Sequence, residues 1–270
     1  MEYLKIYNKN YKLVQSIYSS RLKIQILLAL SRGNKSLSDL REISGSTSQA
    51  LIPKIRALER LSLIESYEAG YSLTSPGRIV TGKIEDFVIT LGEVQQHREF
   101  WSNHDLTGLP QQFLDDIGQL IDSEIQFDTA TDILHVYSNF IRIIDEADYV
   151  LGISSMMSPE IANVIGTRVI SGKRLELIVD QSIHHQLTIE PFLSQTRQLL
   201  GFDNFHIWVY NNPLGIGVTV TNKHLSLGFN SKDGKVYDST TDLYSTDQKA
   251  IDWGQRLFNY YRDRSTKLTI

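Results

Sequence analysis

Apolar residues recur every three or four positions in the N-terminal part of the chain, which is the spacing of one buried helix face. The spacing predicts four helices, over residues 11–19, 20–31, 36–44 and about 47–61. The apolar positions of the last three helices are Leu22, Ile26, Leu27, Ala29 and Leu30, then Leu37, Leu40 and Ile43, and finally Leu51, Ile55, Leu58 and Leu61. Gly33-Asn34 and Gly45 end two of them, because glycine and asparagine tolerate left-handed backbone. Ser36 and either Thr47 or Ser46 are the expected N-terminal caps.

Two short strand-like runs follow within SLIESYEAGYSLT, residues 62–74, on either side of the turn Glu68-Ala69-Gly70. A short helix, a tight turn, a second helix and a hairpin form the pattern of a winged helix-turn-helix. Such units place the second helix in the major groove of DNA, and the hairpin reaches the neighbouring backbone or minor groove. The sequence therefore predicts a DNA-binding domain over residues 1–76.

Pro53 lies within the second helix of that unit, and proline deep in a helix removes a backbone donor and costs about 3 kcal/mol. It is tolerable if the regular helix starts late, near Leu51, or if the first turn is loosely wound. Beyond the hairpin, a long helix is predicted from about Gly77 to Trp101. We expect residues 77–101 to link two domains and to pair the subunits of a homodimer, with packing on its own domain as the alternative.

Beyond a polar, glycine-ended segment, SNHDLTG at residues 102–108, apolar runs of strand length alternate with helical patterns. Predicted strands cover residues 124–127, 149–154, 174–179, 206–210, 215–221, 225–230 and 235–238. Predicted helices cover residues 132–146, 159–171, 190–201 and 248–262. This order predicts an α/β domain over residues 109–270, with a mostly parallel sheet that has an antiparallel edge. The chain is thus expected to join an α+β head to an α/β body.

Composition sharpens this picture. The chain has no cysteine, which excludes disulfide scaffolds, thiol catalysis and thiolate metal sites. Residues 1–90 carry 13 Lys and Arg against 8 Asp and Glu, whereas the remainder carries 14 against 23. A basic head on an acidic body favours DNA as the partner of the head. Because no apolar run could span a bilayer and no secretory signal is visible, we expect a cytoplasmic protein without membrane contact.

The residues that turn outward on the second helix of the winged unit are the candidates for reading DNA. Gln49 can pair with an adenine and Arg56 with a guanine, each worth roughly 1–3 kcal/mol of discrimination. Ser46, Thr47 and Lys54 are candidates for phosphate contacts, which position a protein without reading sequence. The full set of expected DNA contacts is Ser46, Thr47, Ser48, Gln49, Lys54, Arg56, Arg60, Tyr67, Tyr71 and Arg78. Each residue alone also fits a solvated surface, and some winged helices bind only protein.

Catalysis by the α/β body is the sharpest alternative. The order of its elements is similar to the phospholipase-D-like fold, whose enzymes use the motif H-x-K-x4-D. Here the candidate histidines read His206-Ile-Trp, His224-Leu-Ser and His184-His185-Gln, so none supplies the required lysine. No Walker loop, nucleophile elbow, dinucleotide fingerprint or zinc-protease motif is present. We therefore predict no enzymatic activity, no cofactor and no metal site.

The ends of the predicted strands offer a place for a ligand, because α/β sheets bind ligands beyond the carboxyl ends of their strands. Ser158 opens a helix there, and a helix N-terminus favours an anion. Late in the chain, His224, Asp238 and Asp242 surround the predicted hairpin and can line the same pocket. The candidate ligand-binding residues are Ser154, Ser155, Asp180, Asn211, His224 and Asp238. The alternative is that these side chains only cap helices and form turns.

Two stretches of the chain, residues 27–65 and 225–265, resemble the methanogenesis-regulator family of archaeal winged-helix transcriptional regulators. Their most particular parts are SQALIPKIRALE at Ser48–Glu59 and AIDWGQRLFNYYR at Ala250–Arg262. The resemblance implies an ArsR-like DNA-binding head and a C-terminal sensor domain that looks related to the sugar-sensing TrmB-type domain. It also makes Pro53 an expected feature, and it implies no particular effector.

The sequence therefore predicts a dimeric archaeal transcriptional regulator that binds double-stranded DNA and whose C-terminal domain senses a small-molecule effector or a partner. Two alternatives stay open: a catalytically degenerate phospholipase-D-like phosphodiesterase, and a module that binds only other proteins. Sequence-selective, salt-sensitive binding to duplex DNA distinguishes the regulator from both.

Overall fold

The computed structural model describes residues 2–154 and 156–269, and the chain divides into two compact units that meet between Ile89 and Thr90. This boundary falls inside one long helix, α5 (Ser75–Gln96), within the segment that we expected to link two domains. Across the described residues, no helix is both long and apolar enough to cross a membrane. The two units are described separately.

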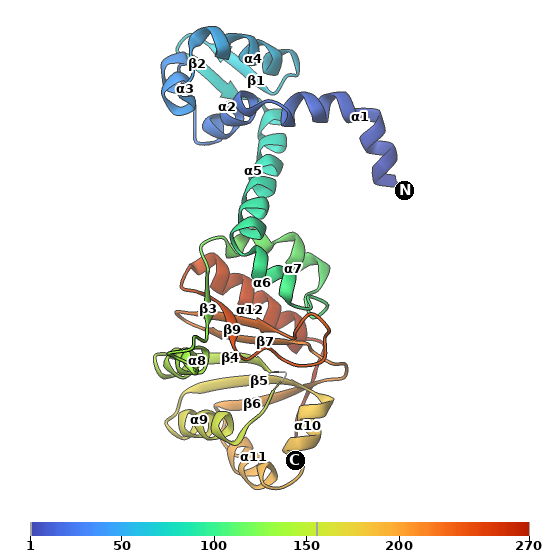
Figure 1. Cartoon of the computed structure of the whole chain (residues 1–270), viewed down its shortest axis with the longest axis vertical. Helices are drawn as coiled ribbons and strands as arrows, with labels where there is room; N and C mark the ends of the chain where they lie inside the picture. Colours follow the sequence, from blue (N-terminus) through green and yellow to red (C-terminus); the bar gives the residue numbers. More distant parts are fainter. Residues whose placement is uncertain (1, 155, 270) are drawn as a thin grey trace. The chain divides into compact units, whose positions relative to one another are not determined.

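The N-terminal unit is a winged helix-turn-helix preceded by a further helix (Figure 1). Its elements are α1 (Glu2–Tyr18), α2 (Arg21–Ser31), α3 (Leu37–Ser44), α4 (Ser48–Arg60), β1 (Ile64–Tyr67), β2 (Gly70–Leu73) and the first part of α5. β1 and β2 pair antiparallel and form the wing. The predicted helices and hairpin are all present, although α1 begins well before the expected residue Tyr11.

Polar side chains at the helix starts fix these boundaries. Ser36 and Asp39 form a capping box, in which Ser36 Oγ accepts from the Asp39 amide at 3.1 Å and the Asp39 carboxylate accepts from the Ser36 amide at 2.8 Å. Thr47 caps α4 by accepting from the amide of Ala50 at 3.3 Å. Gly45 has a φ of 60°, the left-handed turn that lets α4 follow α3 directly.

Pro53 lies inside α4, which begins at Ser48, so the late start near Leu51 that would have accommodated the proline does not occur. Thr47 caps the helix at its start, and Pro53 lies on the exposed side of α4. The opposite side of α4 is almost fully buried against α2, α3 and β1 through Leu51, Ile55 and Leu58. Because this side of α4 is buried, the side that carries Gln49, Arg56 and Arg60 faces solvent.

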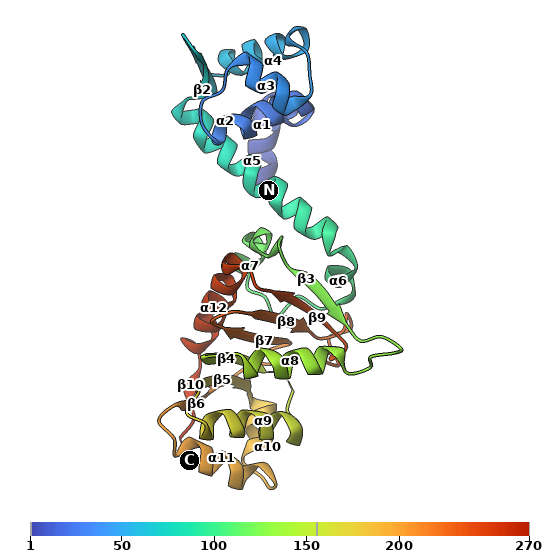
Figure 2. The same ribbon diagram turned by 90° about the vertical axis from the view of Figure 1, so that its left-hand side faces the viewer.

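The C-terminal unit is a mixed sheet with helices on both faces (Figure 2). Its helices are the end of α5, α6 (Arg98–Asn103), α7 (Gln111–Asp115), the 3-10 helix η1 (Ile117–Leu120), α8 (His135–Asp145), α9 (Pro159–Ile170), α10 (Gln181–Leu187), α11 (Phe192–Leu200) and α12 (Gln248–Arg262). Its strands are β3 (Glu124–Phe127), β4 (Tyr149–Ser154), β5 (Arg174–Asp180), β6 (Phe205–Tyr210), β7 (Ile216–Thr221), β8 (Leu225–Phe229), β9 (Thr241–Ser245) and β10 (Thr266–Lys267).

Within the described ranges, the strand order is β10-β6-β5-β4-β7-β8-β9-β3. The α/β domain beside a winged helix is confirmed, but the prediction of a mostly parallel sheet is corrected, because only β4–β5 and β5–β6 pair in parallel. A parallel neighbour needs a crossover of roughly a dozen residues or more, usually a helix. Among neighbouring strands, helices connect only β4 to β5 and β5 to β6, the two parallel pairs. A short loop joins β6 to β7, and the strands from β7 to β9 pair antiparallel with one another. Antiparallel pairing therefore reaches the middle of the sheet.

One predicted strand was misplaced. Residues 235–238 were expected to pair after the hairpin turn, but the strand is β9, and Tyr237 makes only an isolated bridge to Asn230. The carboxylates of Asp233 and Asp238 accept from backbone amides two residues further on, at 3.2 and 2.9 Å. These local turns hold the segment as a loop until regular pairing begins at Thr241.

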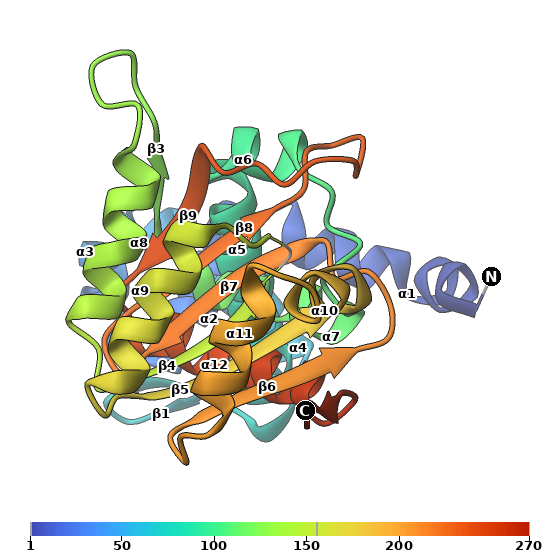
Figure 3. The ribbon, with the colours of Figure 1, turned by 90° about the horizontal axis from the view of Figure 1, so that it is seen from below.

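Two apolar cores flank the sheet. On one face, Trp253, Leu257 and Phe258 of α12 pack against the central strands and are fully buried. On the other face, α9 and α11 cover β4, β5 and β6, and α8 lies beside α9 (Figure 3). A cavity lies on this second face.

Candidate functional sites

The outward side of α4 presents the residues that we predicted to read DNA. Gln49, Arg56 and Arg60 are exposed there, and Ser48 is partly buried at the start of the helix. The Arg56 guanidinium is 70% exposed and lies 3.1 Å from the carboxylate of Glu59. An exposed pair of this kind is weak, so Arg56 can exchange Glu59 for another acceptor. This side of α4 therefore offers one amide and two guanidinium groups to a partner.

A buried lysine that the sequence analysis did not single out adds positive charge near this helix. Lys23 of α2 is only 7% exposed, and its ammonium group donates to the carbonyl and hydroxyl oxygens of Ser16 at 2.9 and 2.7 Å. Burial, together with the charges of Lys54 and Arg60, lowers the pKa of Lys23. No local sequence pattern predicted this burial, because Lys23 occupies an inward position among the apolar residues of α2.

The hairpin contributes unequally to this surface. Tyr67 is exposed at the end of β1, whereas Tyr71 packs against the core of the unit and its backbone pairs with Lys35. The hydroxyl of Thr47 is already engaged as the cap of α4, although the residue itself is exposed. Arg78 is exposed on the first turn of α5. Tyr67 is thus better placed than Tyr71 to meet an external partner.

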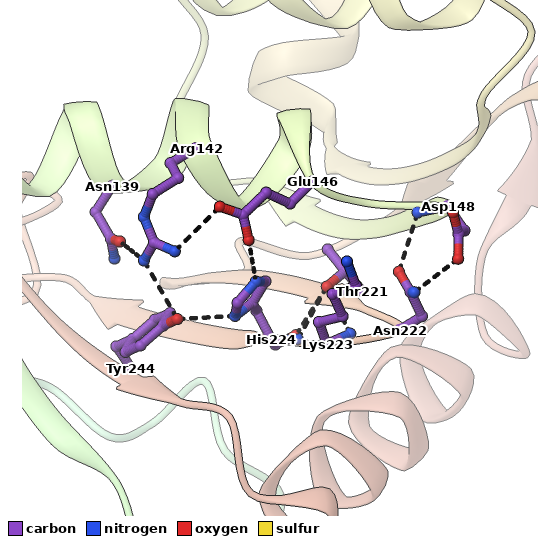
Figure 4. Close-up of polar contacts among 9 residues, drawn as sticks. All are labelled: Asn139, Arg142, Glu146, Asp148, Thr221, Asn222, Lys223, His224 and Tyr244. Carbon is purple, nitrogen blue, oxygen red and sulfur yellow. Dashed lines mark hydrogen bonds and ion pairs between the residues drawn. The ribbon is translucent and has the colours of Figure 1, made fainter.

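His224, the candidate nucleophile of the phosphodiesterase alternative, is locked in a hydrogen-bonded network (Figure 4). Its Nε2 lies 3.1 Å from the carboxylate of Glu146 and its Nδ1 lies 2.8 Å from the hydroxyl of Tyr244. Arg142 donates to the Tyr244 oxygen at 3.2 Å, so the hydroxyl proton is left for Nδ1 and the Nε2 proton for Glu146. The hydrogen bond from His224 is the main reason that the pKa of Glu146 is lowered.

Neither ring nitrogen of His224 is therefore available for attack on a substrate. The same network ties α8 to β8 and β9, and Asn222 extends it by bonding Asp148 through both of its amide atoms, at 3.0 and 2.8 Å. This arrangement is a structural brace. In the part of the chain that the structure describes, no group of three metal-binding side chains comes together either.

A cavity of about 430 Å³ lies over the sheet beneath α8 and α9. Apolar residues of α8, α9, β4, β5 and β7 form most of its wall, among them Phe140, Ile165 and Leu177. The loop before β9 closes one end with polar residues. A volume of this size matches pockets that hold one small organic molecule.

The structure places the predicted ligand residues in different surroundings. Ser154 and Asp238 both line the cavity. Asp180 instead caps α10 by accepting from two backbone amides at 3.0 Å, and Asn211 accepts from Gln181 at 3.1 Å, both outside the cavity lining. His224 also lies outside the lining, in the brace described above. Ser155 lies outside the described residues.

The cavity itself lies over the face of the sheet, and a ligand site beyond the strand ends stays a prediction. Gly152 and Gly217 line it, and the side chains of Leu177 and Tyr237 pack directly against these two glycines. The expected anion position at the start of α9 is already satisfied, since Ser158 caps the helix and Glu160 occupies its first turn. The sequence showed the glycines but not which side chains would pack against them.

Comparison with known proteins identifies both units. Residues 11–92 match the N-terminal domain of methanogenesis regulatory protein FilR1, and residues 133–264 match its middle domain. The methanogenesis regulatory protein FilR1 of Methanothrix harundinacea (strain 6Ac) is 27% identical over 260 residues, which cover 95% of this chain. The chain spans 58% of the length of that relative.

The similarity to solved structures is weak. TrmBL2, an archaeal chromatin protein, is 11% identical, with 96% of this chain and 98% of that chain covered and a TM-score of 0.42. The riboflavin-derivative dimethyltransferase RosA of Streptomyces davawensis is 14% identical, with 78% and 66% covered and a TM-score of 0.27. At these scores neither structure informs the function of this chain. The matches to two successive domains of one protein, which together cover most of the sequence, carry the assignment, and the chain belongs to the FilR1 family of methanogenesis regulatory proteins.

Proposed function

We propose that this chain is a cytoplasmic transcriptional regulator that binds double-stranded DNA through α4. The observation that carries the proposal is the exposed side of α4, where Gln49, Arg56 and Arg60 lie outward from a helix whose other side is buried. The helix follows the tight turn at Gly45, as the reading helix of a helix-turn-helix does. The regulatory family of the chain supports the same role.

We expect this surface to make two kinds of contact with DNA, one with the bases and one with the phosphates. Gln49 and Arg56 carry the groups that pair with adenine and guanine, so they select the sequence. Lys54 and Arg60, with the buried charge of Lys23 nearby, provide the positive field that attracts phosphates. The proposed domains remain residues 1–76 for DNA binding, 77–101 for linkage and dimerisation, and 109–270 for regulation.

The proposal can be tested without knowing the operator, by selecting the duplexes that the protein binds from a library with a randomised central segment. We expect the full chain to enrich one sequence, and Gln49→Ala combined with Arg56→Ala to weaken binding to it by about 2–6 kcal/mol. Arg197→Ala combined with Gln198→Ala, which removes the same side-chain types from the exposed side of α11, is the matched control. Unchanged affinity in the α4 double variant would refute the reading helix. Failure to enrich any duplex would favour a module that binds only proteins.

We propose further that two copies pair through α5. Phe87, Leu91 and Val94 recur at spacings of four and three and are 46%, 52% and 44% exposed, so one side of α5 carries an exposed apolar stripe. Helix α1 adds a second exposed apolar side, and its Tyr18 ring packs edge-on against Phe87 at 5.4 Å. A second copy would bury both surfaces, and a twofold dimer would present two reading helices to two half-sites.

The oligomeric state in solution tests this pairing. Leu91→Glu places a charge in the stripe and should yield monomers in analytical ultracentrifugation. Ile89→Glu makes the same chemical change on another side of α5, at a residue that is also exposed, and should leave the dimer intact. A monomeric wild-type chain, or dimers that survive Leu91→Glu, would contradict the proposal.

A further inference from the structure

The cavity over the sheet has one polar end, which β8, β9 and the loop between them build. Asp238 and Thr240 come from this loop, Asp242 from β9 and Ser226 from β8. Asp128, which precedes α8, adds a third carboxyl group. Among the described residues that line the cavity there is no lysine, arginine or histidine. The polar end is therefore acidic and contains no cation of its own.

Two glycines let the side chains at the polar end of the cavity lie directly against the backbone of the sheet. Gly217 and Gly228 pair across β7 and β8, and a Cβ at either position would overlap the hydroxyl group of Tyr237. A Cβ at Gly228 would also overlap Oδ1 of Asp242. The phenol group of Tyr237 and the carboxylate of Asp242 thus both lie close against the backbone of this strand pair, and both residues line the cavity.

Asp242 lacks a partner for one of its oxygens. Ser226 Oγ donates to Asp242 Oδ2, but no donor in the described part of the chain reaches Oδ1. The residue is only 8% exposed, and burial raises its pKa to about 7. An unpaired buried carboxylate is costly, so a ligand that brings a donor and a positive charge gains more here than in water.

Asp238 keeps its negative charge at the same end. Burial alone would raise the pKa of Asp238, but hydrogen bonds from Thr240 and His104 outweigh it and hold the pKa below its ordinary value. Its oxygens bond Thr240 at 2.9 and 2.6 Å and His104 at 3.2 Å, and His104 is not part of the cavity lining. The cavity therefore presents one fixed carboxylate beside one unpaired carboxyl group.

We infer that this cavity binds a small organic cation, an amine whose ammonium group lies at the acidic end and whose apolar body lies against α8 and α9. The ammonium group supplies the donor that Asp242 Oδ1 lacks and the positive charge that the lining lacks. The apolar body fills the space lined by Phe140, Ile165 and Leu177. The inference rests on the proposed regulatory function, since it names the chemical class of molecule that the C-terminal domain senses.

Ligands that share one apolar body and differ only in the head group test this charge preference. Phenethylamine, phenylpropylamine and phenylbutylamine would be titrated into the full chain by calorimetry at neutral pH, beside the alcohols and carboxylic acids of the same chain lengths. We expect the best amine to bind at least about tenfold more tightly than its alcohol, and the acid to bind more weakly than the alcohol. Asp242→Asn should abolish the preference for amine over alcohol. Asp252→Asn, which removes an exposed carboxylate from α12, should preserve it.

Three results would overturn the inference: no amine binds, an acid binds as tightly as its amine, or Asp242→Asn retains the preference. The head-group comparison in the wild-type chain decides the question even if Asp242→Asn does not fold. DNA selection on the same preparation separates the two proposals. Enrichment of a duplex without amine binding overturns only the ligand class, and amine binding without enrichment overturns only the DNA-binding function.

Discussion

We expect Glu93→Gln to remove much of the pH dependence of stability in the C-terminal unit. Glu93 lies near the end of α5 and is 0% exposed, and neither of its carboxylate oxygens has a hydrogen-bond partner in the described chain. The nearest cationic candidate is His97, whose Nε2 is 3.8 Å away and whose own pKa is lowered by burial. The indole nitrogen of Trp101 lies near the carboxyl group and also lacks a partner.

The magnitude follows from the pKa. Burial raises the pKa of Glu93 from 4.5 to about 8, so between these values the folded chain holds a proton that the unfolded chain has lost. Stability therefore falls as pH rises through this window, and Glu93 has no effect on stability well below pH 4.5. At about 1.4 kcal/mol per pH unit, the loss from pH 5 to pH 8 is at most about 4 kcal/mol. Glutamine cannot ionise, so the variant should lack this loss.

Urea unfolding at pH 5 and pH 8, followed by tryptophan fluorescence, measures the effect. Trp101, Trp208 and Trp253 all lie in the C-terminal unit, so their emission reports the unit that contains Glu93. Glu99→Gln, which neutralises an exposed carboxylate on α6, is the control and should leave the pH dependence unchanged. Equal pH dependence in wild type and Glu93→Gln would refute the reasoning.

Three further predictions concern other parts of the chain. Gly217→Ala should destabilise the C-terminal unit by about 1–3 kcal/mol in urea unfolding, and Tyr237→Ala in the same chain should relieve much of this loss, because the added methyl group meets the phenol. Ser36→Ala should cost the N-terminal unit about 1 kcal/mol, measured by circular dichroism during urea unfolding, since it removes one half of a capping box. Lys54→Ala should weaken DNA binding about equally for all sequences and reduce the salt slope by about one, measured by titration at several salt concentrations.

The N-terminal unit could be predicted in detail because the signals that build it are local. The boundaries of α3 and α4 follow from Ser36, Gly45 and Thr47, each of which acts on backbone within a few residues of itself. The sequence placed the start of the first helix too late and left the tolerance of Pro53 open, because that tolerance depends on the exposure of this side of α4. The winged helix was thus predictable from spacing and caps.

The sheet was harder to predict because strand neighbours are set by contacts far apart in the chain. The runs that became β7 and β8 were recognised, but nothing local showed that β7 would lie next to β4 in the middle of the sheet. The run at Thr241–Ser245, which became β9, shows no apolar–polar alternation, and the turn residues before it favoured an earlier strand. Contacts between distant segments also explain why only some of the predicted ligand residues line the cavity. Asp180 and Asn211 lie at strand ends, whereas the cavity is formed over the sheet face by several separate segments.

Asp238 shows how the cavity is joined to the rest of its unit. It lines the cavity, and its second oxygen bonds Nε2 of His104, the residue that ends α6. Nδ1 of His104 in turn bonds the carbonyl of Phe100 within α6 at 2.7 Å, and the amide of Asp105 donates to Asn230 at 3.0 Å. Asp238 thus contacts both the interior of the cavity and the residue that ends α6. Helix α6 begins two residues after the end of α5, so His104 joins the cavity lining to the short helix that follows the linking helix.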